Sequence, residues 1–390
     1  MRVLREWDRV RGAKIAAATQ AGQSDWTFGP VLEGDTACVE HSTFRLGGLK
    51  SPEVGRIFLH MQTARTDEAA NTITGYMHPR YARSHQEFGI PRELPRCGGW
   101  VVERAIPGFP HSDAMGCYPL FACRDWSQVH LDVEDLRNEL VSLALVTDPF
   151  GSYDQRYLRR CFPDVVVPFK EHYVVDLDKP RNKVVSKHHR YEARKALRQV
   201  SVHVHPNPPD FLDVWMDLHS HLIAKHNIKG IASFSTAAFA EQLATPGMVL
   251  LWASYEDQPV AAILHFVQND VAYAHILGCT VDGYQRGALY AVIWSAIEHF
   301  TTSVRWLDIM GVPGAQDTGS EGILQFKRGW TRETRTAWFC GRILNRERYA
   351  EIVKATGTSL ARYFPAYRDG EMARFKDELP PAGADSATGS

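Results

Sequence analysis

The sequence predicts a mixed α/β fold of two lobes, each built on a mixed, mostly antiparallel sheet flanked by helices. Strand-like and helix-like segments follow one another in the order β-β-β-α-β in the second half of the chain, and a similar series precedes it. A connection containing Pro residues, 162–178, separates the two series. At roughly 150 residues per domain, 390 residues suffice for two cores.

The predicted division is a first lobe at residues 1–170, a second lobe at 171–378 and a disordered tail at 379–390, which lacks apolar anchors. In the first lobe, strand character occurs at residues 36–44, 98–105, 114–122 and 141–151. A helix is expected at 132–140, where early acids suit its N-terminal dipole. Residues 162–178 are expected to be a connection that closes with a strand at 172–176.

The second lobe opens with an amphipathic helix expected at 183–200. Four of its cations, Lys187, Arg190, Arg194 and Arg198, lie within one narrow arc at 100° per residue. A short strand and a helix at about 210–225 come next, and a strand at 305–311 closes the series. Three strands in a tight meander (248–256, 259–268, 270–279) and a helix (288–300) lie between them.

Composition excludes several classes of protein. The chain has 44 Lys and Arg against 45 Asp and Glu, which argues against a surface wholly adapted to nucleic acid or acidic membrane. Its seven cysteines include no CxxC pair, so neither a disulfide framework nor a thiolate zinc site is indicated. The histidines show no metal-ligand spacing, and no metal is expected. With neither a signal-peptide core nor a membrane span in the sequence, a cytoplasmic protein is expected.

Residues Gln285, Arg286, Gly287 and Ala288 lie where a strand meets a helix. Free N–H groups and a positive dipole at a helix start suit a phosphate, and Gly lets it approach the backbone. A lone Gly at this place is also an ordinary turn device. The segment is therefore a candidate phosphate site or a plain turn.

Three residues of the second lobe are candidates from their positions on strands. Asp308 ends an apolar strand, where a carboxylate can orient an attacking amine or take its proton, or can cap the following turn. Tyr273 and His275 are two residues apart on the expected central strand, so both point into the same cleft or the same core.

The second lobe resembles the Fem-like branch of the GNAT acyltransferase superfamily. The resemblance covers about residues 140–340 and depends on an Asp-Leu strand before a basic helix, on the Tyr-Gln-Arg-Gly-Ala helix entry and on the Phe-Lys pair at 326–327. It implies two GNAT-type lobes in one chain and transfer of an acyl or aminoacyl group to an amine. It also implies that residues 285–288 bind the donor.

Lys327 is the main catalytic candidate that the resemblance implies. Fem-like enzymes place a Lys at this position beside the donor, where a cation stabilises a developing oxyanion. The alternative is a surface Lys beside a buried Phe. Lys187, Arg190 and Arg194, with Tyr191 beside them, either contact phosphates of the donor or form a solvated face.

The function expected is an N-acyltransferase, such as an acetyltransferase, with no bound cofactor. Its co-substrate is acyl-CoA or alternatively aminoacyl-tRNA, and its acceptor is a small-molecule, sugar- or peptide-linked amine. Residues 285–288 resemble a shortened form of the Gly-rich loop with which GNAT enzymes bind the donor, so both donors remain possible. The net charge of −1 favours the thioester. The competing hypothesis is a non-catalytic GNAT-like protein that binds a nucleotide or a partner, since fold alone does not fix activity.

Overall fold

The computed structural model describes residues 73–226, 233–311, 320–361 and 363–369, all within one compact unit, Thr63–Ser390. The strand expected at 36–44 and the tail expected at 379–390 lie outside the described residues. The helices are α3 (Pro79–Arg83), α4 (Val129–Asp135), α5 (Gln155–Cys161), α6 (Arg181–Val184), α7 (Lys187–Ala196), α8 (Leu212–His226), α9 (Thr236–Leu243), α10 (Val281–Gln285), α11 (Ala288–Phe300), α12 (Ser320–Trp330) and α13 (Arg346–Thr356).

The described strands form one 11-stranded sheet in the order β1-β2-β3-β4-β11-β5-β10-β9-β8-β7-β6. Their bounds are β1 (Ile90–Leu94), β2 (Gly99–Ala105), β3 (Ser112–Gly116), β4 (Ser142–Val146), β5 (Val165–Asp176), β6 (Ser201–Val204), β7 (Met248–Tyr255), β8 (Gln258–Gln268), β9 (Val271–Cys279), β10 (Trp306–Gly311) and β11 (Thr334–Ile343). Only β3 with β4 and β9 with β10 pair in parallel. The predicted mixed α/β class is therefore confirmed.

The two halves of the sheet repeat one topology. In the first half, the antiparallel strands β1, β2 and β3 lead through α4 to β4, which runs parallel to β3. In the second half, β7, β8 and β9 lead through α11 to β10, which runs parallel to β9. Each parallel strand then pairs antiparallel with a strand from the other half of the sequence: β4 with β11 and β10 with β5.

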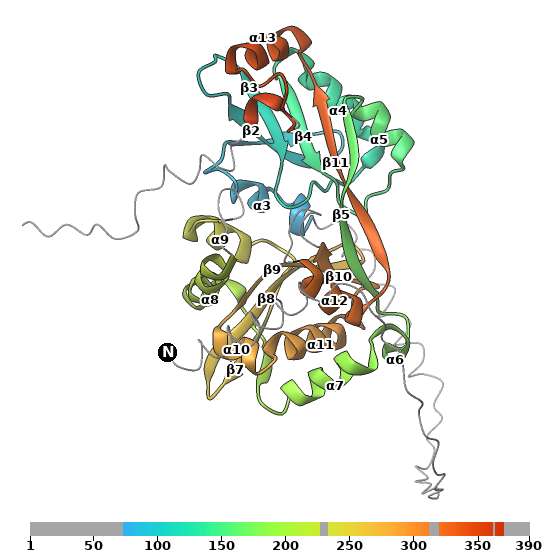
Figure 1. The fold of residues 1–390 in the computed structure, drawn as a ribbon, viewed down its shortest axis with the longest axis vertical. Coiled ribbons are helices and arrows are strands. Elements are labelled where there is room, and N and C mark those ends of the chain that lie inside the picture. The colour runs from blue at the N-terminus through green and yellow to red at the C-terminus, as the bar shows by residue number, and fades with distance from the viewer. Residues whose placement is uncertain (1–72, 227–232, 312–319, 362, 370–390) are drawn as a thin grey trace, which may run out of the picture. The chain divides into compact units, whose positions relative to one another are not determined.

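Strands β5 and β11 join the two halves, because they also pair with each other over most of their lengths (Figure 1). β5 crosses the boundary predicted at 170/171, and β11 returns from the second lobe to the first half of the sheet. The assignment of 1–170 and 171–378 to separate lobes stays a prediction.

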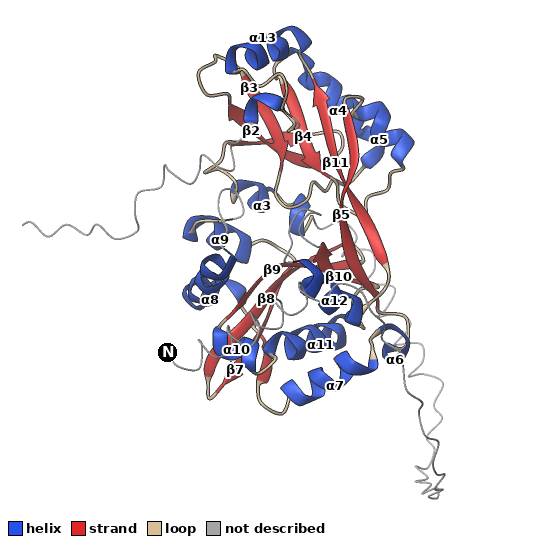
Figure 2. Cartoon of the chain, viewed as in Figure 1, coloured by secondary structure: helices blue, strands red, loops and turns tan. Residues whose placement is uncertain are grey.

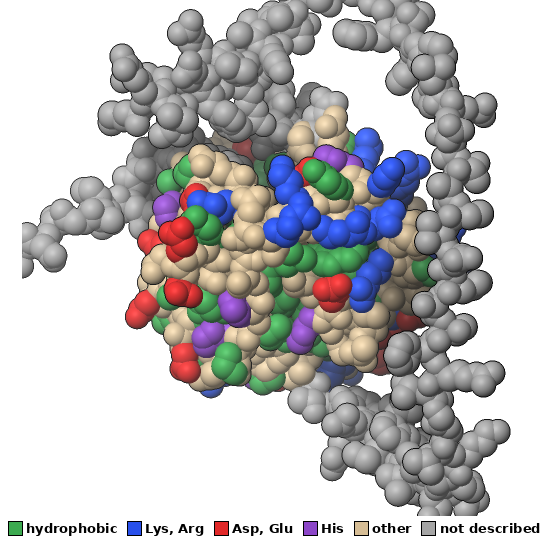
Figure 3. Space-filling model, turned by 90° about the horizontal axis from the view of Figure 1, so that it is seen from below, with side chains coloured by type: hydrophobic (Ala, Val, Ile, Leu, Met, Phe, Trp, Pro, Cys, Tyr) green, Lys and Arg blue, Asp and Glu red, His purple; other side chains and the backbone are tan. Residues whose placement is uncertain are grey.

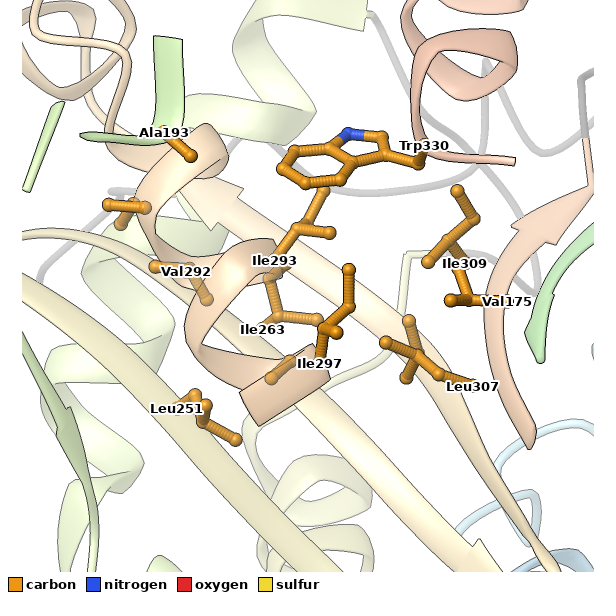
Figure 4. Close-up of a cluster of buried hydrophobic side chains, with 14 of the residues drawn as sticks. Val175, Ala193, Leu251, Ile263, Val292, Ile293, Ile297, Leu307, Ile309 and Trp330 are labelled. Carbon is orange, nitrogen blue, oxygen red and sulfur yellow. The ribbon is translucent and has the colours of Figure 1, made fainter. Parts of the chain in front are cut away.

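Helices cover both faces of the second half of the sheet (Figure 2). On one face, side chains of α7, α11 and α12 pack on alternate residues of β5, β8 and β10. Figure 4 shows Val292, Ile293 and Ile297 of α11 between the strand residues Ile263 and Leu307 and the indole of Trp330. On the other face, α3, α8 and α9 pack on the residues between these.

Three expected segments differ in the structure. Residues 162–178 are mostly strand β5. The strand tolerates Pro168 because this residue lies beside a bulge, where the ladder with β11 is interrupted and a missing N–H costs little. The helix expected at 183–200 begins anew at Lys187, where the hydroxyl of Ser186 caps it. The helix expected at 132–140 begins at Val129 and tightens into a 3-10 turn at Leu136–Asn138.

Candidate functional site

The candidate site lies where the parallel strands β9 and β10 separate, a place named here the β9/β10 fork. The two strands pair only from Val271 opposite Trp306 to Tyr273 opposite Asp308. Beyond Tyr273, β9 continues to Cys279 and stays paired with β8 on its other edge. Over residues 274–279, the edge of β9 that faces β10 pairs with no described strand. The backbone donors and acceptors of this edge therefore face the fork.

A carboxylate and an imidazole form a buried pair at the fork. Asp308 Oδ2 accepts a hydrogen bond from His172 Nδ1 at 2.7 Å, and Asp308 Oδ1 accepts one from the Met310 N–H at 2.7 Å. Because the carboxylate fixes the proton on Nδ1, Nε2 of the neutral ring carries a lone pair. No described residue is hydrogen-bonded to that Nε2.

Lys327 reaches the end of β10 from α12. Its Nζ donates to the carbonyl oxygens of Met310 at 2.9 Å and Gly311 at 2.6 Å. Both carbonyls are available because the register with β5 shifts between Asp308 and Gly311, and Met310 has φ 71°. An ammonium has three N–H donors, so one remains for a ligand. Burial lowers the pKa of Lys327 to about 8, against the opposing attraction of Asp308.

Gly311 places these groups beside one another. A Cβ at this position would lie 3.1 Å from His172 Nε2 and 3.0 Å from Lys170 Cβ, whereas its own carbonyl accepts from Lys327. The imidazole nitrogen and the two lysines therefore surround the last residue of β10.

Tyr273 lies opposite Asp308 in the register and bonds to a second carboxylate. Its hydroxyl is 2.9 and 3.0 Å from the two carboxylate oxygens of Asp148, which follows β4. Burial raises the pKa of Asp148 to about 6, although the Phe150 N–H and the Tyr273 hydroxyl both stabilise its charged form. This pair ties the first half of the sheet to the fork.

His275 lies in the core. Its Nδ1 is 3.2 Å from the Tyr76 hydroxyl and its Nε2 is 3.2 Å from Gln242 Oε1. Burial lowers the pKa of His275 to about 3, so the ring is neutral at physiological pH. Of the two alternatives for this strand face, the structure places both His275 and Tyr273 among buried side chains.

The predicted donor segment surrounds the start of α11. Gly287 has φ 69°, and a Cβ there would meet nothing closer than 3.7 Å. Gln285 is exposed, and Ala288 is buried against the core. Arg286 is committed elsewhere, because its Nε donates to Asp282 at 2.8 Å and its guanidinium lies 3.2 Å from the centre of the Tyr255 ring. The Arg286 side chain is therefore engaged within the protein, and a phosphate site at the N-terminus of α11 stays a prediction.

The basic residues of α7 lie on the surface. Lys187 and Arg194 are exposed, as is Arg198 just after the helix, and Tyr191 is 57% exposed. Arg190 is half-buried, and its Nε has no hydrogen-bond partner in the described part of the chain. Figure 3, which views the molecule from below, shows Lys and Arg side chains gathered on this face. Arg194 and Arg198 lie at the end of α7 that adjoins Gly287, through Ala196.

Lys327, Asp308 and Tyr273 thus share the fork. Residues 285–288 lie at the junction of α10 and α11 and not, as expected, where a strand meets a helix, because α10 intervenes after β9. Sequence reasoning missed three groups: His172, Asp148 and Lys170. Lys170 and His172 lie in β5 and Asp148 follows β4, and the pairing of β5 with β10 and β11 and of β4 with β11 brings these distant segments together. The sequence signal at Asp148 is the Asp-Pro pair at 148–149, which predicts the end of a strand.

In the described residues, no group of three or more His, Cys, Asp or Glu side chains is placed to hold a metal ion. The six cysteines of this part of the chain are buried, and none of them forms a disulfide with another described cysteine. Among the same residues, no helix has the length and apolar character needed to cross a membrane.

Residues 183–328 match the family model described as acetyltransferase (GNAT) domain. The match includes α7, the meander, α11, β10 and Lys327, so these elements form a GNAT-type acyltransferase domain. None of the curated proteins compared with the chain matches it.

Two solved structures share the fold over most of the described chain. FemX superposes with a TM-score of 0.53 at 10% identity, covering 70% of this chain and 93% of its own. The C-terminal domain of a putative lysylphosphatidylglycerol synthetase from Agrobacterium fabrum gives a TM-score of 0.53 at 13% identity, covering 76% and 95%. The family match identifies residues 183–328 as a GNAT acyltransferase domain, and the two superpositions show that the chain shares its fold with FemX and with that synthetase domain.

Proposed function

We propose that the chain transfers an acyl group from an acyl-CoA thioester to a primary amine. The observation that carries this proposal is the fork, because its open β9 edge runs from Asp308 towards the start of α11. An extended donor can hydrogen-bond to this edge as an added strand does, with its pyrophosphate at the N-terminus of α11. Its thioester then lies beside Lys327 and His172.

The side chains at the fork supply the two functions that acyl transfer needs. The His172 Nε2 lone pair accepts the proton that the amine loses as its nitrogen bonds to the thioester carbon. Asp308 keeps the ring in this tautomer and stabilises the imidazolium. The third N–H of Lys327 donates to the oxyanion that forms. When the carbon–sulfur bond breaks, the CoA thiolate takes the proton from the imidazolium, which restores the site.

Tyr273 has a positioning role in this scheme. Its hydroxyl is held by Asp148, and its place opposite Asp308 fixes the side of the fork on which the amine approaches.

Aminoacyl-tRNA is the second candidate donor, and the surface of α7 is the observation that favours it. The cations Lys187, Arg190, Arg194 and Arg198 form a stripe that leads to the start of α11, and several phosphates could pair with them. The affinity for a tRNA donor should fall steeply as the salt concentration rises, because many phosphates are paired. The affinity for CoA should fall only slightly.

The test measures donor binding at two salt concentrations in the wild type and in the Arg190→Glu/Arg194→Glu double variant. The thioester proposal expects CoA and acetyl-CoA to bind both proteins, and expects CoA thiol to be released from bound acetyl-CoA when an amine is added. Loss of charged-tRNA binding in the double variant, together with no affinity for CoA in either protein, would overturn it.

A further inference from the structure

A large groove covers the place where β3 and β4 separate in the first half of the sheet. Its volume is about 1090 Å³, and we name it the β3/β4 groove. Met115 and Gly116 of β3 and Ala144, Leu145 and Val146 of β4 line it. Beyond Met115 the two strands form no further pair, and Phe121 pairs with Thr147 farther along the edge of β4.

The lining of the groove is mainly apolar and aromatic. Among its larger side chains are Phe88, Tyr118, Phe169, Phe339, Tyr363 and Phe364. Ile90, Phe169 and Tyr363, which border it, are 72%, 44% and 44% exposed. Large apolar side chains that gather exposed around one hollow are typical of a ligand groove.

Lys170 joins this groove to the fork. β5 carries a bulge at Phe169, since Lys170 pairs with Ala337 and Pro168 with Trp338, and the bulge directs both Phe169 and Lys170 to the groove. Lys170 also adjoins Gly311, and its charge acts on Lys327. Lys170 is therefore a lining residue of the groove that also lies next to Gly311, the residue that His172 Nε2 adjoins.

The charge of Lys170 is unbalanced in the described residues. No ion pair forms with its ammonium, and its nearest recorded partner is the Phe169 ring at 5.2 Å. Burial lowers the pKa of Lys170. The other charged groups of the groove are Arg104 and Arg368, which pair with Asp113, and Glu87 and Asp369, which lie exposed at the rim. A ligand with one negative charge next to the fork would complement the lysine.

We propose that the β3/β4 groove binds the acceptor, and that the acceptor is a 2-amino acid with a long apolar side chain. Its carboxylate pairs with Lys170, its amine lies next to His172 and its side chain fills the groove. A carboxylate matches the single charge of Lys170 better than a doubly charged phosphate does. This assignment rests on the proposed amine acylation, because it names the acceptor of that reaction.

The experiment measures direct binding of three probes by calorimetry, with no donor present. 2-Aminododecanoic acid has the carboxylate, the amine and the chain; dodecylamine lacks the carboxylate, and alanine lacks the chain. We expect the first to bind at least 10-fold more tightly than either of the others. Lys170→Gln should abolish its advantage over dodecylamine, and Met115→Trp should weaken both long-chain probes by filling the groove.

Lys183→Gln, which removes an exposed lysine of α6, is the matched control and should bind all three probes as the wild type does. CoA binding and thermal melting of each variant show whether it is folded. Equal affinity for alanine and 2-aminododecanoate, or an unchanged preference in folded Lys170→Gln, would overturn the inference. Binding is measured without a donor, and acetyl-CoA is then added in a separate assay. Binding of 2-aminododecanoate with no release of CoA thiol in that assay would sustain the groove assignment and refute the acylation.

Discussion

The two parallel strand junctions of the sheet have the same topology and opposite chemistry. Where β9 and β10 separate, Asp308, His172 and Lys327 form a buried polar cluster. Where β3 and β4 separate, the corresponding strand ends present Met115 and Ala144 to an apolar groove. Topology decides where strands separate and leaves backbone edges open, and the side chains then decide what each opening binds.

The helices after the meanders differ as well. α11 has 13 residues and begins at Gly287, whose surroundings are open, whereas α4 has seven residues and is preceded by a 3-10 turn capped by Asp125. Only α11 therefore offers a long helix dipole at an unobstructed start. This difference supports the proposal that the donor and the chemistry belong to the second half and the acceptor to the first.

The largest expected effect is on the proton acceptor of the second half. His172→Gln removes the Nε2 lone pair, so turnover should fall by roughly 10²–10⁴-fold, the range for loss of a general base. His299→Gln, at an exposed histidine of α11, is the control and should keep full activity. Rates are measured as thiol release, and a fall of less than threefold in a folded His172→Gln protein would remove the imidazole from the mechanism.

Lys327→Gln should lower turnover by roughly 10²-fold, as loss of one oxyanion donor does. Because the lowered pKa is about 8, the wild-type ammonium loses its proton as pH rises through 8, and activity should decline there. The residual activity of the variant should lack this decline. Arg328→Gln, at the exposed neighbour, should resemble the wild type. A decline near pH 8 that persists in Lys327→Gln would assign it to another group.

Asp148 should make the protein less stable as pH rises. Its pKa in the folded protein is about 6, raised from 3.8, so the folded state holds its proton more tightly than the unfolded chain. The stabilisation is full below about pH 4 and is lost as pH rises through 6. Relative to Asp148→Asn, the wild type should lose about 2 kcal/mol of unfolding free energy between pH 4 and pH 7. Unfolding free energies are measured by denaturant titration at each pH. If they change with pH by the same amount in the wild type and in Asp148→Asn, the raised pKa is contradicted.

Two glycines with the same backbone angle give the smallest and most specific test. Gly287 has φ 69° and Gly357 has φ 68°, and a Cβ at either has room. Substitution by Ala costs each about 1 kcal/mol of backbone strain. We expect a several-fold rise in KM for the donor in Gly287→Ala and none in Gly357→Ala. Equal KM values would remove the start of α11 from the donor site.

Local pattern predicted much of the second half of the fold. The helix at Ala288–Phe300 and the strands around Met248–Cys279 follow closely from apolar periodicity and turn residues. β5 was misjudged, because a Pro in the sequence does not reveal that a bulge lies beside it. Ser186 splits the basic helix because its hydroxyl caps the second part, a local preference that the longer amphipathic pattern concealed.

The candidate site was predictable only in part. Asp308 is marked by its place at a strand end, and Lys327 by the family resemblance. His172 has no distinguishing neighbours in sequence, and it meets Asp308 through a strand pairing that joins residues 136 positions apart. Such pairings depend on the whole sheet, so sequence periodicity carries no information about them.

Hydrogen exchange with and without CoA tests most directly the assignment of the donor to the second half. Binding to the open edge of β9 and to the start of α11 should protect the amides of residues 274–290, while those of β2 and β3, residues 99–116, exchange unchanged. Protection of residues 99–116 without protection of 274–290, or no protection by CoA anywhere, would contradict the assignment.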